Sequence, residues 1–84
     1  MGVKPNTQTM DRVTAPAAVK ALKAGRVVLA LAMVGGGPEW APVESIARHK
    51  AAAGHTYYVV AFASGYTRVF RAGGTFWMER ASDA

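Results

Sequence analysis

The stretch HTYYVVAFASGYTRVFRAGGTFWME, residues 55–79, decides the fold. It is rich in β-branched and aromatic residues, which favour strands. Two turn dipeptides, Ser64-Gly65 and Gly73-Gly74, divide it into three short segments. The pattern therefore predicts three strands that follow one another in an antiparallel meander.

A helix and a further strand are predicted upstream of the meander. Thr14 is a suitable N-cap and Gly25 a suitable left-handed C-cap, so a short helix is expected from Ala15 to Ala24. The segment from Arg26 to Val34 is apolar without polar alternation. Such a run is typical of a strand covered on both faces, and we expect it at the centre of the sheet.

A second helix is predicted from about Pro42 to Ala53. Val43, Ile46 and Ala47 have the spacing of an inward helical stripe, and Gly54 follows as a stop signal. A helix here would connect the first strand to a parallel neighbour.

These elements predict an α+β fold of two short helices packed on a four-stranded mixed sheet. The expected order is α-β-α-β-β-β, with the antiparallel meander at the C-terminus. Residues 1–14 are expected to form a flexible arm, residues 15–81 a single domain, and residues 82–84 a disordered tail.

The composition excludes some classes of site and favours one class of partner. The 84 residues contain no Cys, and ten Lys and Arg against five Asp and Glu give a formal charge of +5. Disulfides and thiolate metal sites are therefore excluded, and the basic balance favours acidic partners. The longest apolar run, Val27 to Val34, is too short to cross a membrane, so a cytoplasmic protein is expected.

Residues for catalysis or metal binding are not grouped in any known pattern. His49 and His55 are six residues apart, which is not the i,i+4 spacing of a helical metal pair. No nucleophile stands in a recognisable arrangement with a base and an acid. We therefore expect a binding domain and not an enzyme, with no metal and no cofactor.

The leading hypothesis is a domain that binds nucleic acid or another polyanion. If both turns are two-residue loops, Arg71 pairs with Tyr58 on one side and Phe76 on the other, which would form a platform for stacked bases. The same row can be a structural cation–π ladder, and a slip of one residue would exchange the two faces of the sheet. Three further cations are expected to contact phosphates: Arg48, Lys50 and Arg80.

Two alternatives remain open. The chain can be a protein-interaction module that docks through Trp40, Phe70 and Trp77, because exposed aromatic residues are common interface anchors. Less favoured is a nucleotide-binding sponge, in which Gly35, Gly36 and Gly37 hold an anion. A homodimer is expected in either case, because large apolar residues occur on both predicted sheet faces.

Overall fold

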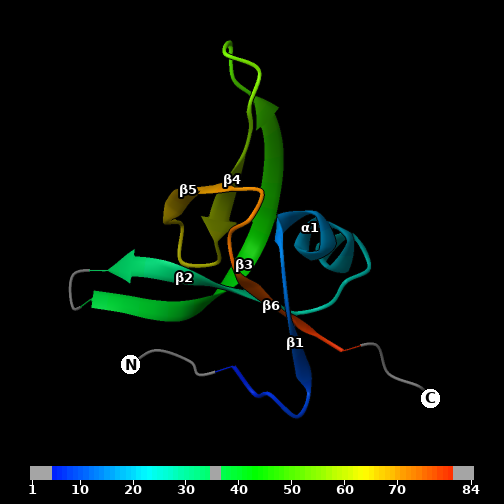
Figure 1. The fold of residues 1–84 in the computed structure, drawn as a ribbon. Coiled ribbons are helices and arrows are strands. Elements are labelled where there is room, and N and C mark those ends of the chain that lie inside the picture. The colour runs from blue at the N-terminus through cyan, green and yellow to red at the C-terminus, as the bar shows by residue number, and fades with distance from the viewer. Residues whose placement is uncertain (1–4, 35–36, 81–84) are drawn as a thin grey trace.

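One curved antiparallel sheet and one helix form the fold in the computed structural model, which describes residues 5–34 and 37–80. The six strands lie in the order β1-β6-β2-β3-β4-β5. Figure 1 shows these elements, whose bounds are β1 Met10–Val13, α1 Ala15–Lys23, β2 Val28–Val34, β3 Gly37–Lys50, β4 Thr56–Phe62, β5 Thr67–Arg71 and β6 Phe76–Glu79. Within residues 5–34 and 37–80, no helix is long and apolar enough to cross a membrane.

The predicted first helix is confirmed as α1. Its buried face consists of Ala15, Ala18 and Ala21, so the helix can lie close against the sheet. Gly25 follows the helix with φ at 79°, a left-handed conformation that glycine adopts without steric cost. Thr14 occupies the N-cap position in an extended conformation, although its side chain makes no capping hydrogen bond.

The predicted second helix is wrong, because residues 42–50 belong to the long strand β3. The pairing of β3 with β4 shifts register between Val43 and Ser45, so one extra residue bulges out of the strand. As a result Val43 and Ile46, three residues apart, both face the core opposite Phe62 and Val60. The bulge therefore produces the three-residue apolar spacing that resembles a helix.

The predicted four-stranded mixed sheet is also wrong, since every pair of neighbouring strands is antiparallel. Without the second helix there is no crossover to make a parallel pair. Strands β4, β5 and β6 form where predicted, but β6 does not continue the meander. It pairs with β2 and with β1, a strand that the sequence analysis placed in a flexible arm.

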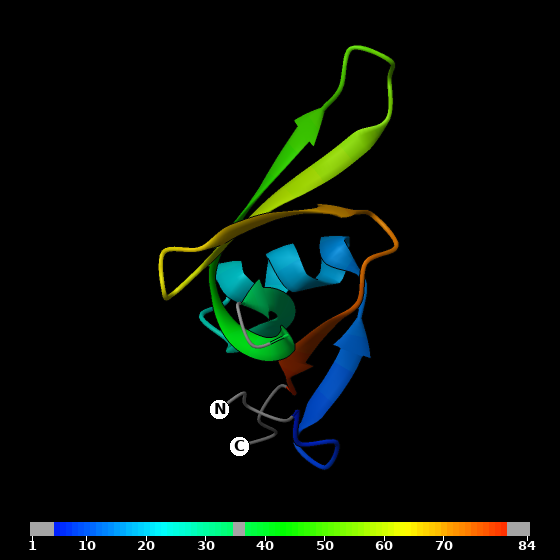
Figure 2. The same cartoon turned by 90° about the vertical axis from the view of Figure 1, so that its left-hand side faces the viewer.

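The sheet curves around α1, and the core fills the space between them. Figure 2 shows the helix between the β3–β5 strands and the pair β1–β6. Four large side chains are almost completely buried there: Phe62, Phe76, Val28 and Val60. They form one cluster with the alanines of α1, so a single core stabilises the domain.

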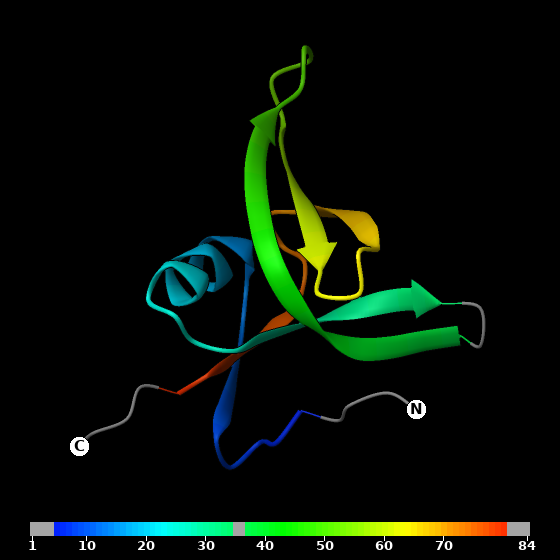
Figure 3. The same cartoon turned by 180° about the vertical axis from the view of Figure 1, so that it is seen from behind.

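Strand β3 connects the strands β1, β6 and β2 on one side of the sheet to β4 and β5 on the other. Its first part pairs with β2, and its second part pairs with β4. Figure 3 shows it running as one bent strand from the β2–β3 hairpin to the β3–β4 hairpin, which projects beyond the rest of the domain. The projecting hairpin and its neighbour β5 therefore expose a sheet surface away from α1.

Candidate polyanion-binding surface

The predicted platform of Arg71, Tyr58 and Phe76 does not form. Tyr58 is only 5% exposed and Phe76 is not exposed at all, so neither ring can stack on a base. Arg71 lies opposite Tyr57, and Tyr58 lies opposite Phe70. The predicted register of β4 and β5 is thus wrong by one residue.

The β4–β5 turn explains this shift. The backbone of Phe62 donates to the Tyr66 carbonyl, and the amide of Gly65 donates to the Phe62 carbonyl. The loop between the paired residues therefore has three members, Ala63 to Gly65, and not two. Gly65 adopts φ of 92°, as the left-handed last residue of such a loop requires.

The outer face of the β3–β5 strands carries a different aromatic and cationic row. His49 lies opposite Tyr57 on β4, which in turn lies opposite Arg71 on β5. The His49 and Tyr57 rings are stacked, with centroids 5.4 Å apart and planes 16° apart. We call His49, Tyr57 and Arg71 the outer row. His49 and Arg71 are exposed and Tyr57 is half-buried, so this row is open to a ligand.

The charge around the outer row is positive and without acidic neighbours in sequence. From Ser45 to Met78 the chain contains Arg48, Lys50, Arg68 and Arg71 but no Asp or Glu. Lys50 is exposed at the end of β3, opposite Thr56, and alternation along the strand places it on the same side as Arg48 and not on the side of His49. Arg71 is therefore the cation of the outer row itself, while Lys50 lies at the same end of the sheet, where a polyanion would meet little local repulsion.

Two of these four cations, Arg68 and Arg48, do not lie beside the outer row. Arg68 is partly buried: its guanidinium donates to the Leu31 carbonyl and lies 4.9 Å from the centre of the Phe70 ring. It therefore holds β5 against β2 and is not available to a ligand. Arg48 is exposed, but it lies on the α1 side of the sheet, where it lines a groove with Tyr58.

Arg80, a predicted phosphate contact, lies far from the outer row in the fold and is already paired. It forms an ion pair of 2.9 Å with Asp11 and also donates to the Gln8 carbonyl. The hydrogen bond with Asp11, together with the charge of that carboxylate, raises the pKa of Arg80. This pairing makes Arg80 a poor candidate for phosphate binding.

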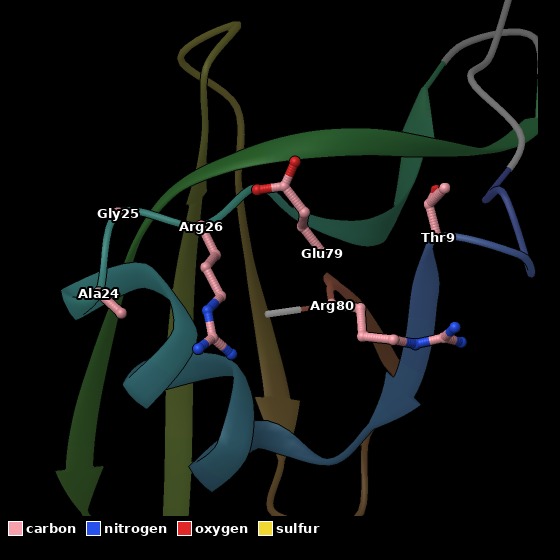
Figure 4. A pocket seen from close by; sticks show the side chains of 6 residues that line it. All are labelled: Thr9, Ala24, Gly25, Arg26, Glu79 and Arg80. Atoms are coloured by element: carbon pink, nitrogen blue, oxygen red, sulfur yellow. The ribbon is translucent and has the colours of Figure 1, made fainter. Parts of the chain in front are cut away.

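An open hollow beside Arg80 does not form a convincing site either. Its volume is about 530 Å³, and Arg26, Glu79 and Arg80 line it together with Thr9, Ala24 and Gly25. In Figure 4 the guanidinium groups of Arg26 and Arg80 point away from each other. The charged groups therefore do not converge on a common ligand position.

No family model, curated protein or solved structure matches this chain. The site is therefore assigned from the charges, burial and register of its own residues.

The predicted interface residues divide between the two faces of the sheet. Trp40 and Trp77 contact each other edge to face, with ring centroids 6.5 Å apart, and both are partly exposed. Phe70 instead packs on Phe76 beneath the sheet, with ring centroids 5.0 Å apart. The grouping of Phe70 with the two tryptophans is therefore wrong.

Apolar residues surround the two tryptophans. Leu31 lies opposite Trp40, Leu29 opposite Trp77, and Met33, which is 47% exposed, continues the same face of β2. Leu29 is itself only 3% exposed. We call Leu31, Met33, Trp40 and Trp77 the Trp surface. It lies on the side of β2 opposite the buried Val28, Ala30 and Ala32.

The predicted anion loop lies mostly outside the described residues. Gly35 and Gly36 lie outside the described residues, and Gly37 is the first residue of β3, with φ of 117°. Within residues 5–34 and 37–80, no three His, Cys, Asp or Glu side chains are grouped as metal ligands would be.

Sequence reasoning missed the functional candidates Tyr57, His49, Lys20 and Lys23. The expected two-residue turn places Tyr58, and not Tyr57, beside Arg71. The shared groove of Lys20, Lys23 and Arg48 depends on the tertiary fold and has no signal in the sequence.

Proposed function

We propose that this domain binds single-stranded nucleic acid through the outer face of the β3–β5 strands, without catalysing a reaction. The outer row supplies two stacked rings and a guanidinium. Lys50, on the other side of β3, adds a second exposed cation at the same end of the sheet. Exposed bases can stack on such rings, while the cations contact phosphates. Single strands are favoured because the bases of a duplex are already stacked on one another.

The observation that carries the proposal is the outer row itself. His49, Tyr57 and Arg71 are directly opposite one another on three neighbouring strands, in a segment without carboxylates. The His49–Tyr57 stack contributes little to the core, since it lies on the face away from α1. Exposed aromatic and cationic groups in one row match the chemistry of a nucleic-acid strand better than that of an apolar ligand.

The test compares two variants of equal net charge in fluorescence anisotropy with a labelled single-stranded oligonucleotide. Lys50→Gln/Arg71→Gln removes the proposed contacts, whereas Arg12→Gln/Arg26→Gln removes two cations elsewhere. We expect the slope of log K against log salt to become shallower by about 1.4 for the first variant, at about 0.7 per lost phosphate contact. Equal weakening by both variants would mean that only net charge matters and would refute the assigned surface.

Stacking is tested separately through Tyr57. Tyr57→Ala removes a ring worth about 1–3 kcal/mol per stacked base, whereas Tyr66→Ala removes an exposed ring from the β4–β5 turn and serves as the control. An affinity for the oligonucleotide that is the same in both variants would contradict a stacking role for the outer row.

The Trp surface favours a second candidate function, binding of a partner protein. Trp and Met are enriched at interfaces, and the edge-to-face pair of Trp40 and Trp77 remains partly exposed. Tryptophan fluorescence of the domain, recorded with and without the oligonucleotide, separates the two surfaces. If the nucleic acid binds the Trp surface, Trp40→Phe and Trp77→Phe will change its affinity; under our proposal they will not.

A further inference from the structure

A groove between α1 and the inner side of β3 and β4 is separate from the outer row. It has a volume of about 210 Å³. Three exposed cations line it, Lys20, Lys23 and Arg48, together with Pro16, Val19 and the buried Tyr58. The groove therefore combines positive charge with apolar and aromatic groups.

Three cations from two elements meet in this groove. Lys20 and Lys23 are three residues apart in the last turn of α1, so they lie on one side of the helix. Arg48 reaches the same groove from β3. None of the three is in an ion pair with another described residue. Glu44 lines an adjacent hollow with Lys23 but is not paired with it.

Tyr58 adds to this groove a hydroxyl that has no partner in the described part of the chain. Only 5% of this residue is exposed, yet its hydroxyl makes no hydrogen bond within residues 5–34 and 37–80. No enclosed side-chain N or O atom of the described residues lacks a hydrogen-bond partner, so the unpartnered Tyr58 hydroxyl is open to the groove and can donate to a ligand there.

We infer that this groove binds a phosphate group, with the Tyr58 hydroxyl donating to a phosphate oxygen and the three cations balancing its charge. A phosphate oxygen accepts a hydrogen bond from the hydroxyl, and its negative charge attracts Lys20, Lys23 and Arg48. The inference rests on the proposed function insofar as the phosphate belongs to a nucleic-acid backbone. A free phosphate compound presents the same chemistry.

Two ligands distinguish these sources: inorganic pyrophosphate, followed by thermal unfolding, and the labelled oligonucleotide, followed by anisotropy. Stabilisation by pyrophosphate would identify a site for free phosphates, whereas a response to the oligonucleotide alone would identify a site for the backbone. In both cases the groove variants Lys20→Gln/Lys23→Gln and Tyr58→Phe must weaken binding. We expect Tyr58→Phe to weaken it about tenfold, as for the loss of a hydrogen bond to a charged group.

Matched controls keep the result interpretable. Tyr66→Phe removes an exposed hydroxyl outside the groove, and Arg12→Gln/Arg26→Gln removes the same charge as the double lysine variant. Tyr58→Phe leaves the ring in the core, so its melting temperature should equal that of the wild type or exceed it slightly.

The inference fails if both groove variants bind pyrophosphate and the oligonucleotide as the wild type does. That result would leave the proposed function intact if Lys50→Gln/Arg71→Gln still weakens oligonucleotide binding. If none of these variants changes oligonucleotide binding, the proposed function fails as well.

Discussion

Phe76→Ala tests whether Phe76 belongs to the core, as the structure has it, or to a ligand platform. The ring is completely buried and packs 5.0 Å from the Phe70 ring, on a strand that joins β1 to β2. Removing such a ring costs about 3–5 kcal/mol, the combined loss of apolar burial and of packing around the cavity. A domain of this size has a total stability of roughly 4–12 kcal/mol, so the variant should be close to unfolding.

Urea unfolding followed by far-UV circular dichroism and tryptophan fluorescence measures the change. In a thermal scan the expected loss corresponds to a decrease in Tm of roughly 15–30 °C. Val69→Ala is the control: Val69 is 61% exposed, and its truncation should change stability by no more than about 0.5 kcal/mol. A Phe76→Ala variant within about 1 kcal/mol of the wild type would refute the core assignment.

Three further outcomes are expected, each measured as a urea unfolding midpoint. Gly65→Ala should destabilise the domain by about 1–2 kcal/mol because φ at this position is 92°, whereas Gly73→Ala, without a positive φ and with nothing within 4 Å of the added methyl, should be nearly neutral. Ile46→Lys should unfold the domain while Ala47→Lys is tolerated, since the bulge turns Ile46 inward and Ala47 outward; equal damage would indicate a helix. Asp11→Asn should leave the midpoint unchanged, because the ion pair that it breaks is exposed to water; a clear decrease would show that the pair holds β1 in place.

Local signals identified the elements whose residues form contacts with near neighbours in sequence. Helix α1 begins after Thr14 and is followed by Gly25 in a left-handed conformation, as its sequence predicts. The three C-terminal strands likewise follow from their β-branched and aromatic composition and from the intervening glycines.

Long-range pairing explains what local signals missed. Strand β1 has only four residues, two of them charged, and becomes a strand by pairing with β6 at the far end of the sequence. In β3 the bulge after Val43 disguises a strand as a helix. Propensity for a helix in this segment is overridden by pairing with both β2 and β4.

The candidate site depended on one loop length. The sequence predicts the chemistry of the outer row, an aromatic ring beside Arg71, but a two-residue turn selects Tyr58 where the three-residue loop selects Tyr57. Because side chains alternate along a strand, this single residue moves the ring from the exposed face to the core. The groove between α1 and the inner side of β3 and β4, in contrast, is formed by residues far apart in the sequence and has no signature there.

The measurement that tests the account most directly is the affinity of the wild-type domain for a labelled single-stranded oligonucleotide between about 50 and 200 mM salt. Three phosphates are assigned to cations: one shared by Lys20, Lys23 and Arg48 in the groove, one at Lys50 and one at Arg71. If all three are contacted, log K should fall against log salt with a slope of about −2.1, a loss of roughly 20-fold across this range. Absence of binding at the lowest salt, or an affinity that does not change with salt, would contradict the account.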